Sequence, residues 1–201
     1  MEIYLLRHGQ SEANVLNLVC GQLDYPLTQN GIAQAATACN YLKTIGFDRV
    51  YSSSLSRAIH TVKPLMKEVD VQVYDQLMEL DTGDVSHITL QELRASDARY
   101  RRPWLFPDLR HPGGETFREM IIRISAWFDI HSKSWRDGEK ILIVGHEGTL
   151  RVIYLKLMGL KLDEYPDFPI GNCEQLYFML NNGRVIEHRH LTLNGEVKIN
   201  P

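Results

Sequence analysis

The sequence has few cysteines, no excess of basic residues and no long apolar run, and each shortage excludes a class of protein. Its three cysteines are an odd number without the spacing of a metal-binding motif, which favours reduced thiols over a disulfide framework. Lysines and arginines (22) are balanced by aspartates and glutamates (25), so no overall positive field attracts nucleic acid or an anionic membrane. No apolar run reaches the roughly 18 residues of a membrane span, and no secretory leader opens the sequence. We therefore expect a cytoplasmic protein with neither nucleic acid nor membrane as a partner.

The 201 residues, 44% of them hydrophobic, suffice for a single domain with a full core. Short apolar runs of strand length alternate with helical patterns along the chain. The predicted strands cover 3–6, 48–51, 71–74, 140–144, 174–180 and 185–190, and helices are expected after Thr28, around Arg57, and over 115–135 and 149–158. The turn at Asn182-Gly183 favours a hairpin of the last two strands. This order predicts an α/β fold, a three-layer αβα sandwich with a mostly parallel central sheet and an antiparallel hairpin near the C-terminus.

The stretch from about 83 to 114 departs from the alternation of strands and helices. It holds three prolines and one short helical signal around 90–98, and we interpret it as a small insertion, or lid, over the active site. Its arginines are Arg94, Arg99, Arg101, Arg102 and Arg110. They form either a solvated charged surface or a substrate contact. If two of these arginines face the substrate-binding site, they would favour a substrate with a second phosphate or a carboxylate.

Two predicted strands end in a histidine beside a glycine. His8 follows the first strand with Arg7 before it and Gly9 after it, and Gly145-His146 follows the strand at 140–144. In open α/β sheets, ligands bind beyond the carboxyl ends of the strands. Helix starts at this edge present free backbone N–H groups that favour anions. The alternative for a lone histidine is a structural hydrogen bond to a carbonyl, but two at equivalent strand ends favour a binding site.

The segment Arg7-His8-Gly9-Gln10-Ser11-Glu12-Ala13-Asn14 resembles the signature Arg-His-Gly-(Glu/Gln)-(Ser/Thr)-x-x-Asn of the histidine phosphatase (phosphoglycerate mutase-like) superfamily. Further matches follow in family order: Cys20-Gly21, Ser52-Ser53-Ser54-Leu55-Ser56-Arg57-Ala58-Ile59-His60-Thr61, Glu79 and Val144-Gly145-His146. The blocks at 7–14 and 52–61 together are highly specific. By this resemblance the chain is identified as a member of the superfamily, in its small phosphatase branch.

The resemblance implies that His8 attacks phosphorus and forms a phosphohistidine, which water then hydrolyses. Phosphoryl transfer needs neutralisation of the equatorial oxygens, and Arg7 and Arg57 carry guanidinium forks that bind phosphate bidentately. His146, if protonated, would add a further donor and positive charge. Glu79 stands where the family places the general acid for the leaving alkoxide, a role that favours a raised pKa. Neither a metal nor another cofactor is required.

The remaining candidate residues bind substrate or compete for the acid's role. The predicted substrate-binding residues are Gly9, Gln10, Ser11, Asn14, Cys20, Gly21 and Glu147. The rivals of Glu79 as the acid are Glu147, Asp81 and Asp84. Many phosphatases of the family have Gly-x-Trp-Glu-Gly after the acid, where this chain reads Gly83-Asp84-Val85-Ser86-His87. Cys20 replaces a more usual Ser or Thr, and Glu147 a residue that is often small, and these departures bear on substrate specificity.

These residues predict a metal-independent phosphomonoester hydrolase acting on a small-molecule phosphate ester. One alternative is phosphoryl transfer of the phosphoglycerate mutase type, although a short chain and a short insertion favour hydrolysis. Another is a regulatory protein that binds a phospho-ligand with weak catalysis, although such a protein need not keep a nucleophile and an acid. The natural substrate and the oligomeric state stay open at this point.

Overall fold

Six strands form one sheet in a computed structural model that describes residues 1–198, apart from the side chain of Arg101. They are β1 (Glu2–Arg7), β2 (Arg49–Ser53), β3 (Val71–Tyr74), β4 (Lys140–Gly145), β5 (Gln175–Asn181) and β6 (Arg184–Leu191), in the spatial order β3-β2-β4-β1-β5-β6. The first four strands run parallel, β5 is antiparallel to β1, and β6 is antiparallel to β5. The predicted mixed sheet is confirmed.

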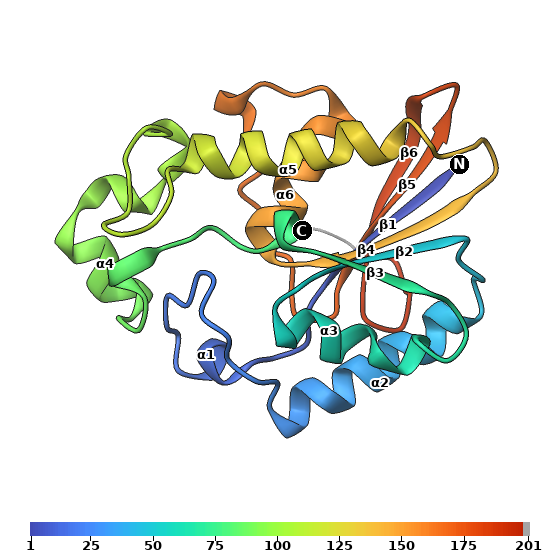
Figure 1. Ribbon diagram of the computed structural model, residues 1–201, viewed down its shortest axis with the longest axis horizontal. Helices are drawn as coiled ribbons and strands as arrows, with labels where there is room; N and C mark the ends of the chain where they lie inside the picture. Colours follow the sequence, from blue (N-terminus) through green and yellow to red (C-terminus); the bar gives the residue numbers. More distant parts are fainter. Residues whose placement is uncertain (199–201) are drawn as a thin grey trace.

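Helices cover both faces of the sheet, as the three-layer prediction requires (Figure 1). On one side lie α2 (Gln29–Lys43) and α3 (Ser56–Val62), and on the other α5 (Phe117–Ser132) and α6 (Glu147–Met158). Two shorter helices, α1 (Glu12–Val15) and α4 (Leu90–Ser96), lie beyond one end of the sheet. As expected, Thr28 caps α2, because its hydroxyl accepts a hydrogen bond from the Gly31 amide. Pro64 lies in a 3₁₀ turn directly after α3.

The alternation of side chains along β1 divides the core into two clusters. Ile3 and Leu5 pack with residues of α5 and α6, whereas Tyr4 and Leu6 pack with residues of α2 and α3. Strand β4 divides its side chains in the same way, and Ile141 to Val144 are all fully buried. A strand enclosed on both faces is expected to be a continuous apolar run, which is what this segment is.

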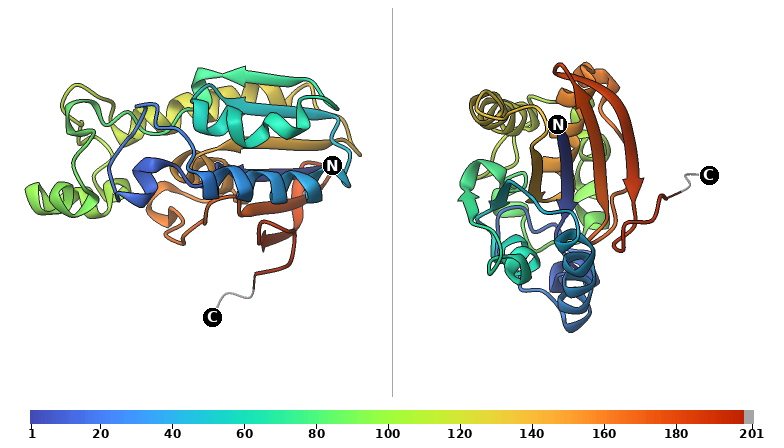
Figure 2. Two further views of the ribbon diagram at one scale, coloured as in Figure 1. Left: turned by 90° about the horizontal axis from the view of Figure 1, so that it is seen from below. Right: turned by 90° about the vertical axis from the view of Figure 1, so that its right-hand side faces the viewer.

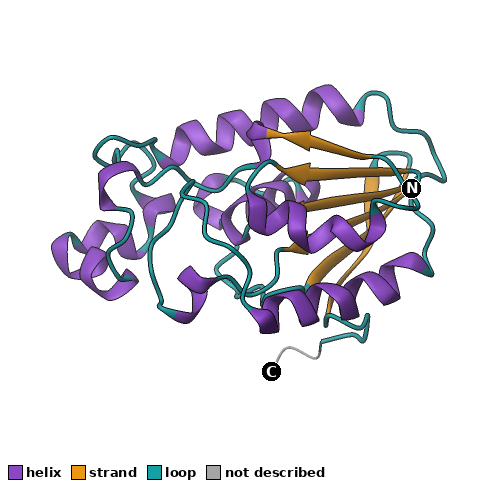
Figure 3. Ribbon diagram, turned by 60° about the horizontal axis from the view of Figure 1, so that its bottom comes forward, coloured by secondary structure: helices purple, strands orange, loops and turns teal. Residues whose placement is uncertain are grey.

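The parallel strands point toward one loop-rich end of the molecule, where their arrowheads lie in Figure 3. The segment 83–114, including α4, lies beyond this end and not beside the sheet (Figures 1 and 2). Of its predicted helical signal, residues 90–96 form α4, and a 3₁₀ turn follows from Ala98 to Arg101. Among residues 1–198, no helix has the length and apolar character to cross a membrane.

One helix boundary differs from the predicted one in a way that affects the site. Helix α6 starts at Glu147, two residues earlier than expected, with His146 as its N-cap. The amides of its first turn are therefore available to acceptors outside the helix. The hairpin turn agrees with its sequence signal, because Asn182 and Gly183 both have positive φ (48° and 73°), as a type I′ turn requires.

Candidate active site

His8 lies at the end of β1 and keeps only 4% of its surface exposed. Its Nδ1 is 2.7 Å from the carbonyl oxygen of Gly9, and because a carbonyl only accepts, Nδ1 carries the proton. Nε2 is then the nitrogen with the free lone pair. No hydrogen bond of Nε2 occurs among the described residues, and this atom is not one of their fully enclosed unpartnered polar atoms. His8 is thus held in the tautomer that a nucleophile needs, with Nε2 reachable from solvent.

Arg57 of α3 is a buried cation, 1% exposed, beside the two histidines. Its Nη1 and Nη2 donate to the carbonyls of Leu23 and Gly21 (2.7 and 2.8 Å), and its Nε donates to Nδ1 of His146 (3.3 Å). Within the described part of the chain, no carboxylate lies within 4 Å of this guanidinium. A buried charge without a counter-charge is costly, so an anion bound here would be stabilised.

His146 is the N-cap of α6 and has partners on both ring nitrogens. Because Nδ1 accepts from Arg57, the proton lies on Nε2, which donates to the hydroxyl of Ser53 at 2.8 Å. The rings of His8 and His146 are 5.1 Å apart, centroid to centroid. Burial and the neighbouring arginines lower the pKa of both histidines well below the usual value. His146 is therefore neutral in this state, and the positive charge considered for it from the sequence is absent.

The lowered histidine pKa values predict a loss of stability toward acid. In the unfolded chain a histidine takes up a proton near pH 6.5, whereas in the folded protein His8 and His146 do so only at lower pH. The free energy of unfolding should therefore fall as the pH drops below about 6.5, approaching about 1.4 kcal/mol per pH unit for each such histidine.

Urea unfolding followed between pH 7 and pH 5.5 measures this slope. The pKa values of His111, His131 and His190 are also lowered by burial, so the wild-type slope sums several groups. The difference between the wild type and His8→Asn isolates the part due to His8, because asparagine does not titrate. Identical slopes in the two proteins would show that His8 is not the acid-sensitive group described above.

Arg7 and Asn14 are held at the cavity by neighbours from the loop before β5. The Arg7 guanidinium donates to the Ile170 carbonyl. The side-chain oxygen of Asn14 accepts from the Ser11 amide (3.0 Å) and from the side chain of Asn172 (3.1 Å). With its oxygen occupied, Asn14 keeps its NH₂ group for a ligand. Asn172 also donates to the His8 carbonyl at 3.0 Å, so one side chain positions both candidate residues.

Glu79 follows β3 and the 3₁₀ turn Asp75–Leu77, and backbone amides hold its carboxylate. Oε1 accepts from the Leu80 amide and Oε2 from the Gly148 amide, both at 3.0 Å. Each carboxyl oxygen has a second lone-pair site, so a proton can still be carried toward the cavity. The contact with Gly148 is close: a Cβ at this glycine would lie 2.3 Å from Oε1 of Glu79. The early start of α6 thus fixes the candidate acid.

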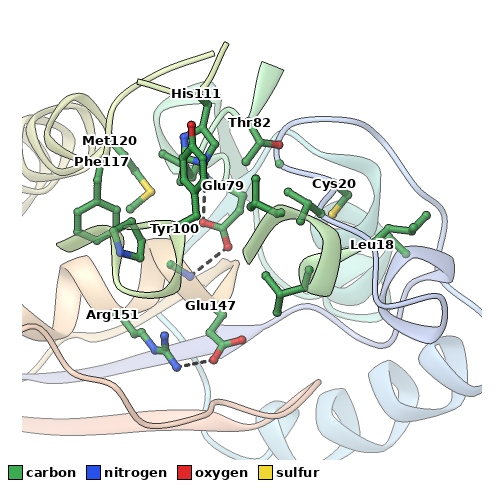
Figure 4. A pocket seen from close by; sticks show the side chains of 18 of the residues that line it. Leu18, Cys20, Glu79, Thr82, Tyr100, His111, Phe117, Met120, Glu147 and Arg151 are labelled. Atoms are coloured by element: carbon green, nitrogen blue, oxygen red, sulfur yellow. Dashed lines mark hydrogen bonds and ion pairs between the residues drawn. The ribbon is translucent and has the colours of Figure 1, made fainter. Parts of the chain in front are cut away.

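Glu147 bridges two arginines at the start of α6. Its Oε2 lies 3.1 Å from Nη1 of Arg7, and its Oε1 accepts from Nη2 of Arg151 at 2.6 Å. Arg151 also donates through Nε to the Phe168 carbonyl at 3.0 Å. The bridge with Arg151 is drawn in Figure 4, where Glu79 and Glu147 point into the same cavity. The Glu147 carboxylate thus already occupies one side of the Arg7 guanidinium, which is predicted to bind phosphate.

A cavity of about 640 Å³ lies over this group of residues, within the size range of ligand sites. Six predicted site residues line it: Arg7, Asn14, Cys20, Gly21, Glu79 and Glu147. His8, Arg57 and His146 are buried beside it and do not count among its lining residues. Burial raises the pKa of the Cys20 thiol, so Cys20 presents a neutral side chain to the cavity. Among residues 1–198, no three His, Cys, Asp or Glu side chains gather in a way that could hold a metal ion.

Three predicted substrate-binding residues have structural partners and do not line the cavity. The Gly9 amide donates to the Thr61 hydroxyl at 2.9 Å, and the Gln10 amide donates to the Gln34 side chain at 2.9 Å. Ser11 caps α1 through a reciprocal capping box with Asn14. Gly9 also needs its small size, because a Cβ there would lie 2.5 Å from the Gly31 carbonyl oxygen.

Of the described insertion arginines, only Arg94 lines the cavity. Arg99 pairs with Asp97 and Arg110 with Glu119, while Arg102 is exposed. The side chain of Arg101 lies outside the described part of the structure. The described residues thus do not place a pair of insertion arginines in the site. Such a pair is the arrangement that would favour a second anionic group on the substrate.

The rivals of Glu79 differ in their position. Asp81 accepts from the Gly83 amide, and Asp84 lies against Gly113, so neither lines the cavity. Sequence reasoning also missed Asn172 and Arg151. The spacing of Glu147 and Arg151, four residues apart, is a signal that could have indicated their ion pair. No local pattern marks Asn172, because its partners lie some 160 residues earlier in the chain.

Comparisons with known proteins identify the family of this chain. Residues 3–190 match the family model described as the histidine phosphatase superfamily (branch 1). A 2,3-bisphosphoglycerate-dependent phosphoglycerate mutase of Beijerinckia indica is 30% identical over 96% of this chain and 98% of its own. An adenosylcobalamin/alpha-ribazole phosphatase of Salmonella typhimurium is 32% identical over 79% of this chain and 80% of its own.

Solved structures give the same result at the level of the fold. The alpha-ribazole phosphatase of Shigella flexneri superposes with a TM-score of 0.79 at 26% identity, covering all of both chains. A mycobacterial glucosyl-3-phosphoglycerate phosphatase superposes with a TM-score of 0.79 at 25% identity, over 97% of this chain and 99% of its own. The family predicted from the sequence motifs is confirmed: this chain belongs to the histidine phosphatase superfamily.

Proposed function

We propose that this protein hydrolyses small-molecule phosphate monoesters through a phosphohistidine on His8. The observation that carries the proposal is the state of this side chain: neutral, fixed by Gly9 with Nε2 free, and next to the buried Arg57 cation, which has no carboxylate partner among the described residues. A phosphate group supplies the missing counter-charge and brings phosphorus to the nucleophile.

In the first step, Nε2 of His8 forms a bond to phosphorus as the bond from phosphorus to the ester oxygen breaks. Arg7, Arg57 and the Asn14 amide bind the equatorial oxygens, whose charge is spread in the transition state. Glu79, protonated beforehand, gives its proton to the departing oxygen, and the alcohol leaves. The Gly9 carbonyl keeps the Nδ1 proton in place throughout.

In the second step, water attacks phosphorus and the bond to Nε2 breaks. Glu79, now a carboxylate, takes a proton from this water, so inorganic phosphate is released and the starting state is restored. His146 touches Arg57 and Ser53 in this state, and we assign it the role of orienting Arg57 beside His8. No metal takes part in either step.

Phosphoryl transfer of the mutase type is the second candidate, because relatives at about 30% identity carry that name. The two activities share the first step and differ in whether the phosphohistidine meets water or a second hydroxyl. The described insertion arginines do not form the paired site that an acidic phosphoglycerate would favour, which supports hydrolysis.

The test measures phosphate release from phenyl phosphate in the presence of a metal chelator. We expect steady turnover. After rapid quenching in alkali we also expect a phosphorylated protein that loses its phosphoryl group in acid, as phosphohistidine chemistry requires. A parallel assay follows phosphoglycerate isomerisation. Binding of phosphate without any turnover would support the regulatory alternative, and isomerisation faster than phosphate release would support the mutase.

A further inference from the structure

The cavity beside His8 has a charged end and an apolar wall. Arg7, Glu79 and Glu147 lie at the charged end, which adjoins the proposed nucleophile. The apolar wall comes from the insertion, from α5 and from loops, through Val19, Leu93, Trp104, Phe117, Met120 and Tyr165. Phe117, Met120 and Leu18 are visible around the cavity in Figure 4. A phosphate held at the charged end therefore directs the rest of its ester toward apolar side chains.

Aromatic contacts fix this wall in place. Trp104 of the insertion stacks on Tyr165 (centroids 5.4 Å apart, 29° between planes), and Phe117 meets Tyr165 edge-on at 5.0 Å. The hydroxyl of the buried Tyr165 donates to the Gly148 carbonyl at 3.3 Å. Gly148 is the residue whose amide holds Glu79, so the aromatic wall adjoins the proposed acid. The alcohol that leaves with the proton of Glu79 thus departs along aromatic surface.

Glu147 places a negative charge at the charged end of the cavity, beside Arg7. It is partly buried, within 3.1 Å of Arg7, and its partner Arg151 already donates to it and to the Phe168 carbonyl. A carboxylate or phosphate on the carbon next to the ester would meet this charge, whose two arginine partners are already paired with it. Arg94, the remaining cation of the lining, is exposed and belongs to the insertion.

We infer that the substrates are monoesters of bulky apolar or aromatic alcohols that carry no anionic group next to the ester, and that Glu147 enforces this selection. The inference rests on the hydrolysis proposed above and names the substrate class of that site. Short acidic esters such as phosphoglycerate are rejected by charge. Burial of apolar surface against the insertion favours large alcohols, by an amount that grows with the area removed from water.

Two matched pairs of substrates test the two halves of the inference. Glycerol 2-phosphate and 2-phosphoglycerate differ only in one group on the carbon that bears the ester, which is a hydroxymethyl group in the first and a carboxylate in the second. Naphthyl and phenyl phosphate differ in apolar area. For the wild type we expect kcat/KM to be about tenfold or more higher for glycerol phosphate than for phosphoglycerate, and higher for naphthyl than for phenyl phosphate.

Glu147→Gln should bring the first ratio close to one, whereas the control Glu68→Gln should leave it unchanged. Glu68 is a matched control because it also forms an ion pair, with Lys43 at 2.8 Å, but does not line the cavity. Trp104→Ala should lower kcat/KM for naphthyl phosphate about tenfold and for phenyl phosphate less. A wild type that prefers phosphoglycerate, or an unchanged ratio in Glu147→Gln, would overturn the inference.

The two proposals fail in different ways. If phenyl phosphate is not hydrolysed, or is hydrolysed equally well by His8→Ala, the proposed function is wrong. If hydrolysis depends on His8 but the ratios do not shift, only the substrate class is wrong. Calorimetric binding of glycerol phosphate and phosphoglycerate to His8→Ala, with and without Glu147→Gln, measures the discrimination without turnover. Equal binding of both esters to His8→Ala would contradict the role of Glu147.

Discussion

Replacing His8 by alanine is expected to abolish phosphate release, lowering kcat by roughly four orders of magnitude or more. The variant lacks the proposed nucleophile, while Arg7 and Arg57 are still expected to bind the ester. The cost to stability from lost hydrogen bonding should be small, because among the described residues the side chain makes a single hydrogen bond, to the Gly9 carbonyl, a contribution of about 1 kcal/mol.

The measurements are steady-state phosphate release, trapping of the phosphorylated protein, and circular dichroism of the folded variant. His60→Ala is the matched control, because His60 lies exposed on α3, three residues from Arg57. It should retain wild-type activity. Turnover of His8→Ala near the wild-type rate, in a protein free of contaminating phosphatase, would remove the basis of the mechanism.

Glu79→Gln should impair esters of alkyl alcohols far more than esters of phenols. An alkoxide is a strong base that needs a proton in order to leave, so its hydrolysis should slow by about 10² to 10⁴-fold. A phenolate leaves more readily, and its ester should lose much less. Comparing kcat/KM for glycerol phosphate and phenyl phosphate, with phosphate release as the readout, measures this difference between alkyl and phenol esters directly.

Two further variants sharpen the assignment of the acid. Gly148→Ala forces a Cβ to within 2.3 Å of Oε1 of Glu79, so the carboxylate must move. We therefore expect alkyl esters to lose more activity than phenyl esters here too, but in milder form. Asp84→Asn, a change outside the cavity, should leave kcat/KM unchanged for both esters. Equal losses on both esters in Glu79→Gln would point to another acid, Glu147 first.

Much of the fold followed from local pattern. The run at 140–144 is apolar without interruption because β4 is enclosed on both faces, and Asn182-Gly183 accepts the positive φ values of a hairpin turn. Helix boundaries were less accurate, since the start of α6 depends on His146 serving as its N-cap, a residue without a capping side-chain hydrogen bond. A weak capping signal leaves the first turn undefined in the sequence.

The sequence by itself determined the family, the order of the strands and helices, and the candidate nucleophile at the end of β1, because each is written in residues that are neighbours in the chain. Only the tertiary structure decided the protonation state of His8 and His146, since burial and the Arg57 charge set it. It likewise decided that Gly148 holds Glu79, that Asn172 orients Asn14, and that Glu147 pairs with Arg7. These contacts join residues between 69 and 158 positions apart, in separate helices, strands and loops, and no local periodicity encodes them.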